Sequence, residues 1–460
     1  MKKRPNLLYV FLDQWRYQAM GHVGADQVKT PNMDRFAQES VDCTEAISTF
    51  PLCSPHRASL LTGKYPFSLG MWTNCKIGLS EVLMLKPQET CIGNVLKDAG
   101  YETGYIGKWH LDASEQNFEK HPVSGARYWD AYTPPGERRQ GFDYWLSYGA
   151  WDQHLDPHYW EDTPKQIKPG CWSPIFETDK ALEYMEKQKD KEEPFALFLS
   201  YNPPHPPYDQ VPEKYYKQYS DMPVIYRENV PEEKKTPEME EITRQYFAAV
   251  TGVDDQFGRL LAYLKENHME EDTLIVLSAD HGEMLGSHGE MSKNIWYEES
   301  IHIPLYMKWK GNLKPSKYHE LVASPDHMPT LLGILGLSIP DTCQGFNHAQ
   351  GIRTGESEAP QDAFLCSYPG MPEMVAAFEK KGLNSKCYGW RGIRTHSHTY
   401  VIYNGYQPGE EQIKLLYDNV KDPYQQNPIR ITRKNQEIVE AYEKRLIEYL
   451  EMQQDPFLMV

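Results

Sequence analysis

FPLCSPHRASLLTGKYP, the sequence of residues 50–66, places a cysteine and an arginine four residues apart across a proline. A small, largely apolar run follows them, which is typical of a buried helix. The pattern predicts that Cys53 lies at a helix N-terminus, where unpaired backbone N–H groups favour bound anions and developing negative charge. Arg57, one turn further on, can point back at the same anion. The stretch therefore predicts a nucleophile in an anion-binding position.

The complete motif, Cys-x-Pro-x-Arg followed by Leu-Thr-Gly-Lys-Tyr-Pro, resembles the signature of the type I sulfatases of the alkaline phosphatase superfamily. A single cysteine is ordinarily an inert buried thiol, but here the match extends over the whole run with its tail in register. The resemblance implies that Cys53 is oxidised to formylglycine, an aldehyde that is hydrated to a geminal diol. It also implies a partner for that step, a formylglycine-generating or anaerobic maturase enzyme.

The length of 460 residues exceeds what one hydrophobic core usually supports, so we expect a large domain with a smaller appendage. Strands alternating with helical patterns predict an α/β fold. The resemblance implies a mixed central sheet flanked by helices, in a catalytic domain that we place at residues 1–355. Residues 356–460 are expected to form a C-terminal α+β subdomain with a small antiparallel sheet and a terminal helix. No low-complexity linker separates the two parts, so they should share an interface.

The formal net charge is −17, with 48 Lys and Arg against 65 Asp and Glu. This balance argues against nucleic acid or an anionic membrane as the partner, because either would require a broad basic face. An acidic protein that binds an anionic substrate must instead do so through a local cluster of cations.

The N-terminal apolar run, residues 7–12, is too short for a signal sequence and predicts a buried first strand. No later segment is long and apolar enough to cross a bilayer. We therefore expect a soluble, cytoplasmic protein, or a periplasmic or secreted one if a signal peptide was trimmed. The eight cysteines are scattered without a CxxC pair, which fits reduced thiols better than disulfides or a zinc ribbon.

Polar pairs follow two of the predicted strands, at residues 7–12 and 274–278. A lone Asp after a strand is usually a cap or turn residue, but in open α/β sheets ligands gather beyond the carboxyl ends of strands. The resemblance implies a divalent metal site formed by Asp13, Gln14, Cys53, Asp280 and His281. Hard oxygen ligands favour Ca²⁺, with Mn²⁺ or Mg²⁺ as alternatives.

Three further motifs match the family: Gly-Lys-Trp-His-Leu at residues 107–111, Pro-Pro-His-x-Pro at 203–207, and the stretch that ends at Lys293. The resemblance implies that Lys108, His110 and Lys293 face the sulfate and that His205 meets the leaving-group oxygen. Without the motifs, a Lys or His after a strand would ordinarily be solvated and idle.

These residues together imply a mechanism. One hydroxyl of the hydrate attacks sulfur in line, while Arg57, Lys108, Lys293 and the metal neutralise the sulfuryl oxygens. His205 protonates the departing alcohol. The second hydroxyl, deprotonated with help from His110, then allows carbon–oxygen cleavage, which expels sulfate and restores the aldehyde. The catalytic set is thus Cys53, Arg57, Lys108, His110, His205 and Lys293.

The middle of the chain, residues 114–191, is rich in Trp, Tyr, Pro and Gly and is expected to form long loops and short helices over the active-site mouth. Residues 151–160 interleave aromatic and polar side chains, which suits a sugar-binding surface and a packed loop equally well. On either side, residues 90–99 predict a helix capped by Thr90, and residues 242–268 predict the longest helix.

Three functions are compatible with these patterns. The first is an exo-acting sulfatase that hydrolyses a small or terminal carbohydrate sulfate. The second keeps the fold and takes a phosphonate monoester or phosphodiester, because Gln14 and His281 also occur in relatives with that activity. The third is a non-catalytic binder of sulfated ligands in which Cys53 is never oxidised; loss of a metal ligand or a lysine would favour it, and the sequence shows no such loss.

Overall fold

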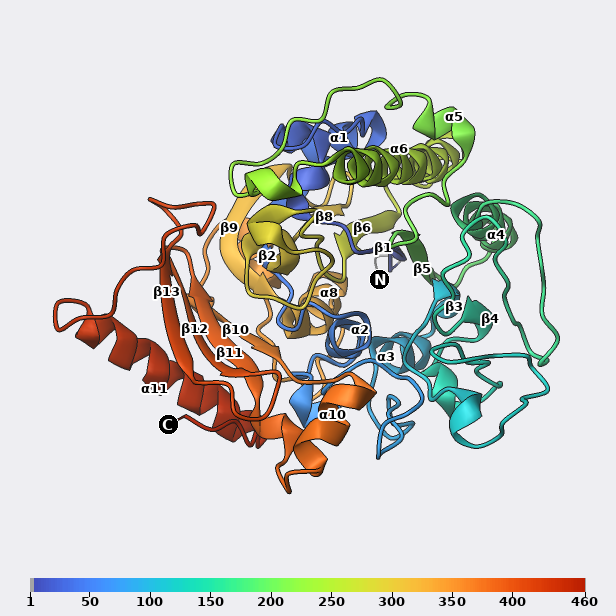
Figure 1. Cartoon of the computed structure of the whole chain (residues 1–460). Coiled ribbons are helices and arrows are strands. Elements are labelled where there is room, and N and C mark those ends of the chain that lie inside the picture. Colours follow the sequence, from blue (N-terminus) through green and yellow to red (C-terminus); the bar gives the residue numbers. More distant parts are fainter. Residues whose placement is uncertain (1–3, 460) are drawn as a thin grey trace.

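The computed structural model describes residues 4–459 (Figure 1). Residues 1–3, which belong to the N-terminal stretch considered above for a signal sequence, and residue 460 lie outside the described residues. The chain folds into a central mixed sheet flanked by helices, with a second, antiparallel sheet towards the C-terminus. The expected α/β fold class is confirmed.

Within the described residues, nine strands form the central sheet in the order β4-β3-β5-β1-β6-β8-β2-β7, with β9 also paired to β2. They are β1 (Asn6–Asp13), β2 (Val41–Ile47), β3 (Glu102–Lys108), β4 (Tyr144–Tyr148), β5 (Phe195–Pro204), β6 (Thr273–Ala279), β7 (His302–Ile303), β8 (Leu305–Lys308) and β9 (Ser316–Ala323). Neighbours from β4 to β6 run parallel, whereas β8 is antiparallel to β6 and β2.

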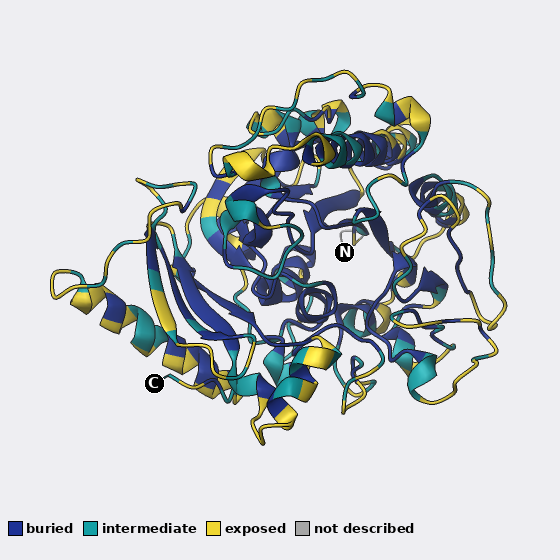
Figure 2. Cartoon of the chain, viewed as in Figure 1, coloured by how far each residue is buried: buried dark blue, intermediate teal, exposed yellow. Residues whose placement is uncertain are grey.

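The inner strands are continuous apolar runs because helices cover both faces of the sheet. In β1, the side chains from Leu7 to Leu12 are all buried, and the strands of the central sheet are the darkest part of Figure 2. The parallel pairing of β1 with β5 and β6, and of β5 with β3, brings the carboxyl ends of these strands to one edge. Side chains that follow these strands therefore lie close together.

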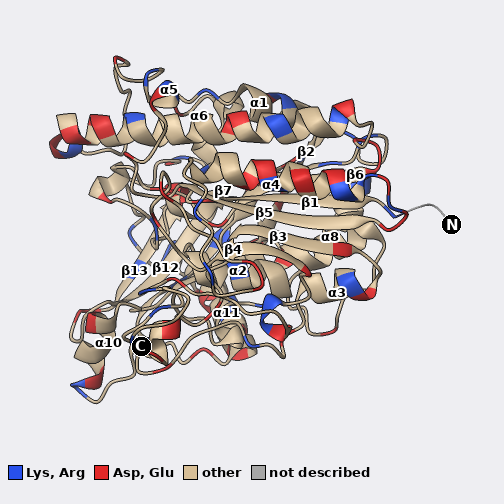
Figure 3. Cartoon of the chain, turned by 90° about the vertical axis from the view of Figure 1, so that its right-hand side faces the viewer, with Lys and Arg blue, Asp and Glu red and all other residues tan. Residues whose placement is uncertain are grey.

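The helices form a layer on each face of the sheet (Figure 3). The helices of the described residues are α1 (Pro31–Gln38), α2 (Cys53–Thr62), α3 (Ile92–Asp98), α4 (Ser173–Gln188), α5 (Glu213–Tyr216), α6 (Pro237–Glu266), α7 (Glu298–Ile301), α8 (His327–Leu335), α9 (Ala349–Thr354), α10 (Pro372–Glu379) and α11 (Gln436–Gln453). Helices α1, α4 and α6 pack on one face, and α2, α3 and α8 lie on the other. Acidic and basic side chains colour the outward faces of α4 and α6, as expected for amphipathic surface helices.

The C-terminal sheet has the order β10-β11-β12-β13, formed by β10 (Asp362–Ser367), β11 (Gly389–Thr395), β12 (His398–Gly405) and β13 (Ile413–Asp418), and all its neighbours are antiparallel. Helix α11 packs along it (Figure 1). A hydrophobic cluster joins this sheet to the central one, with Ile47 and Leu321 on one side and Leu365 and Val401 on the other. The expected shared interface is present, while the boundary at residue 355 stays a prediction.

Two local expectations are wrong. The stretch of residues 114–191 contains a strand of the central sheet, β4, and the sixteen-residue helix α4. Helix α4 has a proline in its first turn and buries one face, as a surface helix does. The Trp- and Pro-rich loop beside it made this helical pattern hard to recognise in the sequence. Helix α3 begins at Ile92, so its N-cap is Cys91 and not Thr90; the Asn94 side chain accepts a hydrogen bond from the Cys91 backbone N–H at 3.0 Å.

Helix α6 begins five residues before the expected start, because Pro237 occupies its first turn and the Thr236 hydroxyl accepts a hydrogen bond from the Met239 backbone N–H at 3.2 Å.

The eight cysteines are free thiols in the structure. Among residues 4–459, no helix combines the length and the apolar character needed to cross a membrane.

Candidate active site

The site lies at the carboxyl edge of the central sheet, where three strands deliver polar side chains. Asp13 is the last residue of β1, Lys108 is the last residue of β3, and Asp280 directly follows β6. All three side chains are buried. The approach of β3 to β5 requires a glycine before Lys108, because a Cβ on Gly107 would lie 2.1 Å from the Ser200 carbonyl oxygen. The expectation that these strand ends converge is met.

Cys53 is the first residue of α2 and is buried beside these groups. Its Sγ lies 3.4 Å from His281 Nε2, 3.9 Å from Asp13 Oδ1 and 3.9 Å from Lys108 Nζ. The helix ends ten residues later at Gly63, which takes the left-handed conformation with φ of 68°. The N-terminus of α2 thus presents residue 53 to a mixed group of carboxylates and cations.

Cys53, Asp13, Asp280 and His281 each offer one donor atom, and these four atoms lie within 4.8 Å of one another. The His281 Nδ1 lies 3.1 Å from the Gly282 carbonyl oxygen, which leaves Nε2 facing the group. Two carboxylates, one imidazole nitrogen and the side chain of residue 53 form a donor set that fits a divalent cation.

The two carboxylates differ in their charged neighbours. Burial and the Cys53 side chain act to raise the pKa of Asp13, but Lys108, His205 and Arg57 outweigh them and lower it. Burial and the charge on Asp13 raise the pKa of Asp280. The difference has a structural basis, since Asp13 Oδ2 contacts both Lys108 Nζ at 2.7 Å and Arg57 Nη2 at 3.0 Å, whereas Asp280 Oδ2 contacts the Nε of Arg57, at 3.2 Å.

The position of the Cys53 side chain favours negative charge. Burial alone would raise the pKa of this thiol, but the nearby Lys108, Lys293 and His281 lower it well below its usual value. For Lys108, burial alone would lower the pKa of the ammonium group. The negative charges of Asp13 and Cys53 outweigh burial, so the pKa of Lys108 is raised. An anion or a developing negative charge at residue 53 is therefore stabilised by this pocket.

The guanidinium of Arg57 lies behind the carboxylates. It donates to Asp13 and Asp280, and its Nη1 donates to the Lys108 carbonyl oxygen at 2.7 Å and to the Ser200 hydroxyl at 2.8 Å. Sequence reasoning expected Arg57 to face the sulfate directly. These contacts hold the two carboxylates in position, and the expected contact of Arg57 with the sulfate stays a prediction.

Gln14 and Lys293 meet at the rim of the site. The Gln14 amide oxygen accepts a hydrogen bond from Lys293 Nζ, and its amide nitrogen donates to Glu283 and to the Tyr208 hydroxyl. The Gln14 backbone N–H donates to Asp280 Oδ1 at 3.0 Å. The backbone of Gln14 thus supports the metal-binding group, while its role as a ligand through the amide oxygen stays a prediction.

A cavity of about 480 Å³ opens over Cys53; we call it the reaction pocket. Five residues singled out from the sequence line it: Cys53, Lys108, His110, His205 and Lys293. Of the aromatic stretch at residues 151–160, Trp151, Asp152 and Gln153 line the pocket, whereas His158, Tyr159 and Trp160 are buried in packing. The expectation of a packed loop is met for these buried residues, and sugar binding by the residues that line the pocket stays a prediction.

His205 is held by a carboxylate that sequence reasoning missed. Its Nδ1 lies 3.3 Å from Asp152 Oδ1 and 2.8 Å from the Pro206 carbonyl oxygen. Burial and the ammonium groups of Lys293 and Lys108 act to lower the pKa of His205, but the carboxylates of Asp152 and Asp13 outweigh them and raise it to about 9. His205 is therefore protonated at neutral pH, as a proton donor must be.

His110 has the opposite character. Its Nε2 lies 3.1 Å from the Cys75 carbonyl oxygen, and its buried Nδ1 has no hydrogen-bond partner among residues 4–459. Burial lowers the pKa of His110, so the imidazole is neutral at neutral pH. It can accept a proton inside the pocket.

Two asparagines accept hydrogen bonds from the groups around Cys53. Asn202, at the end of β5, accepts a hydrogen bond from Lys108 Nζ at 3.1 Å, and Asn74 accepts one from the Ser54 backbone N–H at 2.9 Å. The signal for Asn202 was its place at the end of a buried strand, the same signal that identified Asp13. Asn74 lies in a loop without periodicity, so its contact with the N-terminus of α2 has no local signal in the sequence.

Comparison with known proteins gives matches over nearly the whole chain. A family model described as Sulfatase matches residues 5–337, and one described as N-sulphoglucosamine sulphohydrolase, C-terminal, matches residues 286–452. The chain is 37% identical to an endo-4-O-sulfatase of Bacteroides thetaiotaomicron, over 99% of this chain and 93% of that protein. It is 35% identical to an ulvan-active sulfatase of Formosa agariphila, over 92% of this chain and 76% of that protein.

Solved structures give the same picture. A Bacteroides thetaiotaomicron protein described under the metabolism of multiple glycosaminoglycans superposes with a TM-score of 0.89 at 36% identity, covering 98% of this chain and 97% of that one. A phosphonate monoester hydrolase of Agrobacterium radiobacter has a TM-score of 0.76 at 23% identity, covering 98% and 96%. At that identity the likeness concerns the fold alone.

Proposed function

The chain belongs to the sulfatase family, and from this premise we propose that it hydrolyses a sulfate ester carried by a carbohydrate, with residue 53 in its formylglycine form as the nucleophile. The observation that carries the proposal is the placement of the residue 53 side chain between a carboxylate–imidazole group and the ammonium of Lys108. The conversion of Cys53 would require a maturase enzyme as a partner.

We propose that Asp13, Asp280 and His281, with Gln14 and residue 53, hold a divalent cation, with Ca²⁺ favoured and Mn²⁺ or Mg²⁺ as alternatives. In the unmodified chain, Cys53 Sγ marks the place of the formylglycine oxygen. A bound cation would supply positive charge against the sulfuryl oxygens and make a hydroxyl of the hydrated aldehyde more acidic.

We assign charge neutralisation and proton transfer to different side chains of the reaction pocket. Lys108 and Lys293, which line the pocket, would neutralise the sulfuryl oxygens, and Arg57 would keep Asp13 and Asp280 in position. Protonated His205 gives its proton to the oxygen of the departing alcohol as the sulfur–oxygen bond breaks. Neutral His110 takes up the proton that must leave residue 53 before sulfate is released.

A carbohydrate is the substrate class that the surroundings of the pocket and the relatives favour. The relatives are named for endo-4-O-sulfatase and ulvan-active sulfatase activities, and this pocket is bordered by Trp129 and Trp151, whose planes suit a sugar ring. The exo-acting mode expected from the sequence stays a prediction. Release of sulfate from terminally and internally sulfated oligosaccharides of one composition would separate the two modes.

The alternative of a phosphonate monoester or phosphodiester rests on Gln14 and His281. The sulfatases named above are 35% and 37% identical, and the phosphonate hydrolase is 23% identical, so the sulfate ester is favoured. Measuring kcat/KM for matched aryl sulfate and aryl phosphonate esters tests the choice. A higher kcat/KM for the phosphonate would reverse the assignment.

We predict that His205→Ala slows hydrolysis of a sugar sulfate far more than that of nitrophenyl sulfate. General acid catalysis contributes about 10² to 10⁴-fold, and the benefit shrinks when the departing oxygen is a weak base. A sugar alkoxide is strongly basic and needs the proton, whereas nitrophenolate leaves without it. The measurement is kcat/KM of the variant and the unaltered enzyme for both esters.

Lys293→Ala is the matched control, because a charge that contacts the sulfuryl oxygens should matter for both esters alike. If His205→Ala slowed both esters equally, His205 would not be the proton donor and would be a positioning residue.

Asp152→Asn should move the basic limb of the pH profile to lower pH. His205 with a pKa of about 9 keeps its proton below that pH and loses it above, so kcat/KM for a sugar sulfate should fall above pH 9. Removing the Asp152 charge lowers the pKa of His205; because 48% of this carboxylate side chain is exposed, we expect a shift of roughly one pH unit. Asp156→Asn, an exposed acid in the same loop, should leave the limb in place. An unmoved limb in Asp152→Asn would argue against this pairing.

A further inference from the structure

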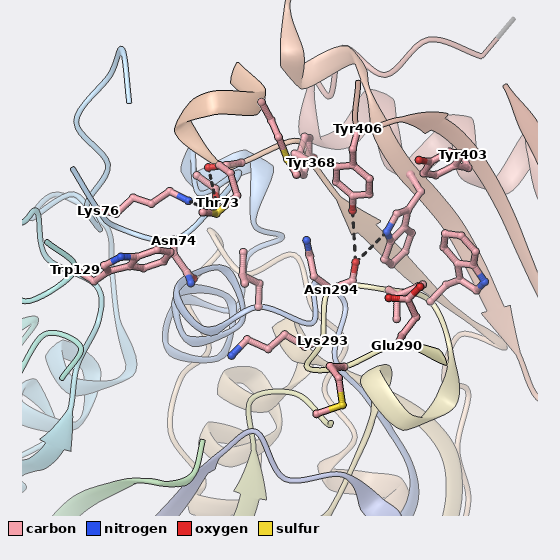
Figure 4. Close-up of a pocket in the computed structure, with 18 residues that line it drawn as sticks. Thr73, Asn74, Lys76, Trp129, Glu290, Lys293, Asn294, Tyr368, Tyr403 and Tyr406 are labelled. Atoms are coloured by element: carbon pink, nitrogen blue, oxygen red, sulfur yellow. Dashed lines mark hydrogen bonds between the residues drawn. The ribbon is translucent and has the colours of Figure 1, made fainter. Parts of the chain in front are cut away.

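A second cavity of about 440 Å³ adjoins the reaction pocket, between the loop that carries Thr73 and Lys76, the loop that carries Asn294, and the C-terminal sheet (Figure 4). Its volume is in the range of pockets that hold small ligands. We call it the aromatic cavity, because Trp129, Trp296, Trp390, Tyr403 and Tyr406 contribute to its walls. The sulfatase mechanism uses none of these aromatic residues.

The two cavities are neighbours. Leu52, Asn74, Trp129 and Lys293 line both of them. A molecule whose sulfate lies against Lys108 and Lys293 can therefore extend past Trp129 into the aromatic cavity. Only a substrate larger than one sulfated sugar would use both.

The far wall is pre-formed by the C-terminal sheet. Trp390 Nε1 and the Tyr406 hydroxyl both donate to the Asn294 carbonyl oxygen, at 3.2 and 3.4 Å, and the Ser367 hydroxyl donates to the Asn294 side chain at 2.7 Å. These bonds, two of which are drawn in Figure 4, hold the loop from the catalytic part against the sheet. A wall of fixed aromatic rings suits the apolar face of a sugar ring, because little side-chain freedom is lost on binding.

Lys76 is a charged group of this cavity that the fold leaves unneutralised. Its residue is only 3% exposed, and its Nζ contacts the Met371 sulfur at 3.6 Å and lies 4.7 Å from the centroid of the Trp129 ring. Neither partner carries a negative charge, and within residues 4–459 this ammonium forms no ion pair with a carboxylate. Burial lowers its pKa to about 8, although the charge on Glu373 opposes the change. A buried ammonium without a counter-ion is costly unless a ligand supplies one.

We propose that the aromatic cavity binds a neighbouring, negatively charged sugar unit of the same substrate, and that Lys76 contacts the carboxylate or second sulfate on that unit. This inference rests on the proposed sulfatase activity and adds a second recognition site to it. In the view of Figure 4, Glu290 lies on the opposite side of the cavity from Lys76, so the anionic group belongs at the Lys76 end. Lys76 is thus a specificity residue at a distance from the reacting sulfur.

The test uses three substrates that share one sulfated sugar and differ in the attached unit: a uronate, its carboxyl-reduced neutral form, and that neutral form carrying a sulfate. The unaltered enzyme should show a kcat/KM about 10- to 100-fold higher for at least one charged neighbour than for the neutral one, the range expected for a hydrogen bond to a charged group. Whichever charged neighbour is preferred identifies the anion.

Lys76→Met keeps an unbranched apolar side chain without the charge and should lose most of this preference, whereas Lys76→Arg should retain it. Lys120→Met, at an exposed lysine outside the cavity, should behave as the unaltered enzyme and controls for net charge. Equal kcat/KM for the charged and neutral neighbours in the unaltered enzyme, or an undiminished preference in a folded Lys76→Met protein, would overturn the inference. Release of sulfate from the neutral substrate in the same series would leave the proposed sulfatase activity standing, and no release from any substrate would reject both.

Discussion

Cys53→Ser is expected to lose multiple turnover, with kcat lower by on the order of 10⁴- to 10⁶-fold, as for removal of a catalytic nucleophile. A serine offers one hydroxyl where the hydrated aldehyde offers two. The variant can attack a sulfate ester once, but it lacks the second hydroxyl whose deprotonation releases sulfate. We therefore expect at most one equivalent of alcohol product per protein molecule, measured in the first turnover, with the sulfate retained on the introduced serine.

Cys171→Ser is the control, because this partly exposed thiol lies outside the reaction pocket and the same exchange should leave kcat unchanged. Sustained turnover by Cys53→Ser at the rate of the unaltered enzyme would reject residue 53 as the formylglycine precursor.

Asp280→Asn should lose both the metal and the activity. Metal content, measured by elemental analysis after dialysis, is expected to fall from about one ion per chain to near zero, with kcat/KM lower by about 10³-fold or more, the several kcal/mol that a metal contributes to charge stabilisation. The cause is the loss of one of the two carboxylates in the group of Asp13, Cys53, Asp280 and His281. The amide has the same shape, and Arg57 keeps its contacts with Asp13, Lys108 and Ser200, so the protein should stay folded.

Asp341→Asn, at an exposed acid far from the strand ends, is the control for loss of one charge. Thermal unfolding gives a second readout. A ligand that binds only the folded state stabilises it, by about 2.7 kcal/mol at a hundredfold excess over Kd. Added cation should therefore raise the Tm of the unaltered protein and leave that of Asp280→Asn unmoved. Full metal content in folded Asp280→Asn would contradict the ligand assignment.

Much of the fold could be predicted because the inner strands carry their own signal. The run from Leu7 to Leu12 is apolar throughout, as buried parallel strands are, and it ends at a polar residue. The edge strand β4 was missed because it is only five residues long, and helix α4 because only one of its faces is buried; both lie within a Trp- and Pro-rich stretch. Their placement depends on the strands already formed beside them.

Some residues of the site could also be predicted from the sequence, and others could not. Residues that follow strands, such as Asp13, Lys108 and Asp280, could be found because topology brings strand ends together. Asp152 could not, because its importance depends on a loop that folds back over His205. The orientation of Arg57 towards the carboxylates likewise depends on hydrogen-bond acceptors from three separate segments, which no local pattern encodes.

The chemistry at residue 53 can be read directly by mass spectrometry of the peptide that contains it, taken from protein whose sulfate release has been measured. The proposal predicts an aldehyde or its hydrate at this position, in a fraction of molecules that rises in proportion to activity across preparations. A preparation with full activity in which every molecule retains the Cys53 thiol would contradict it.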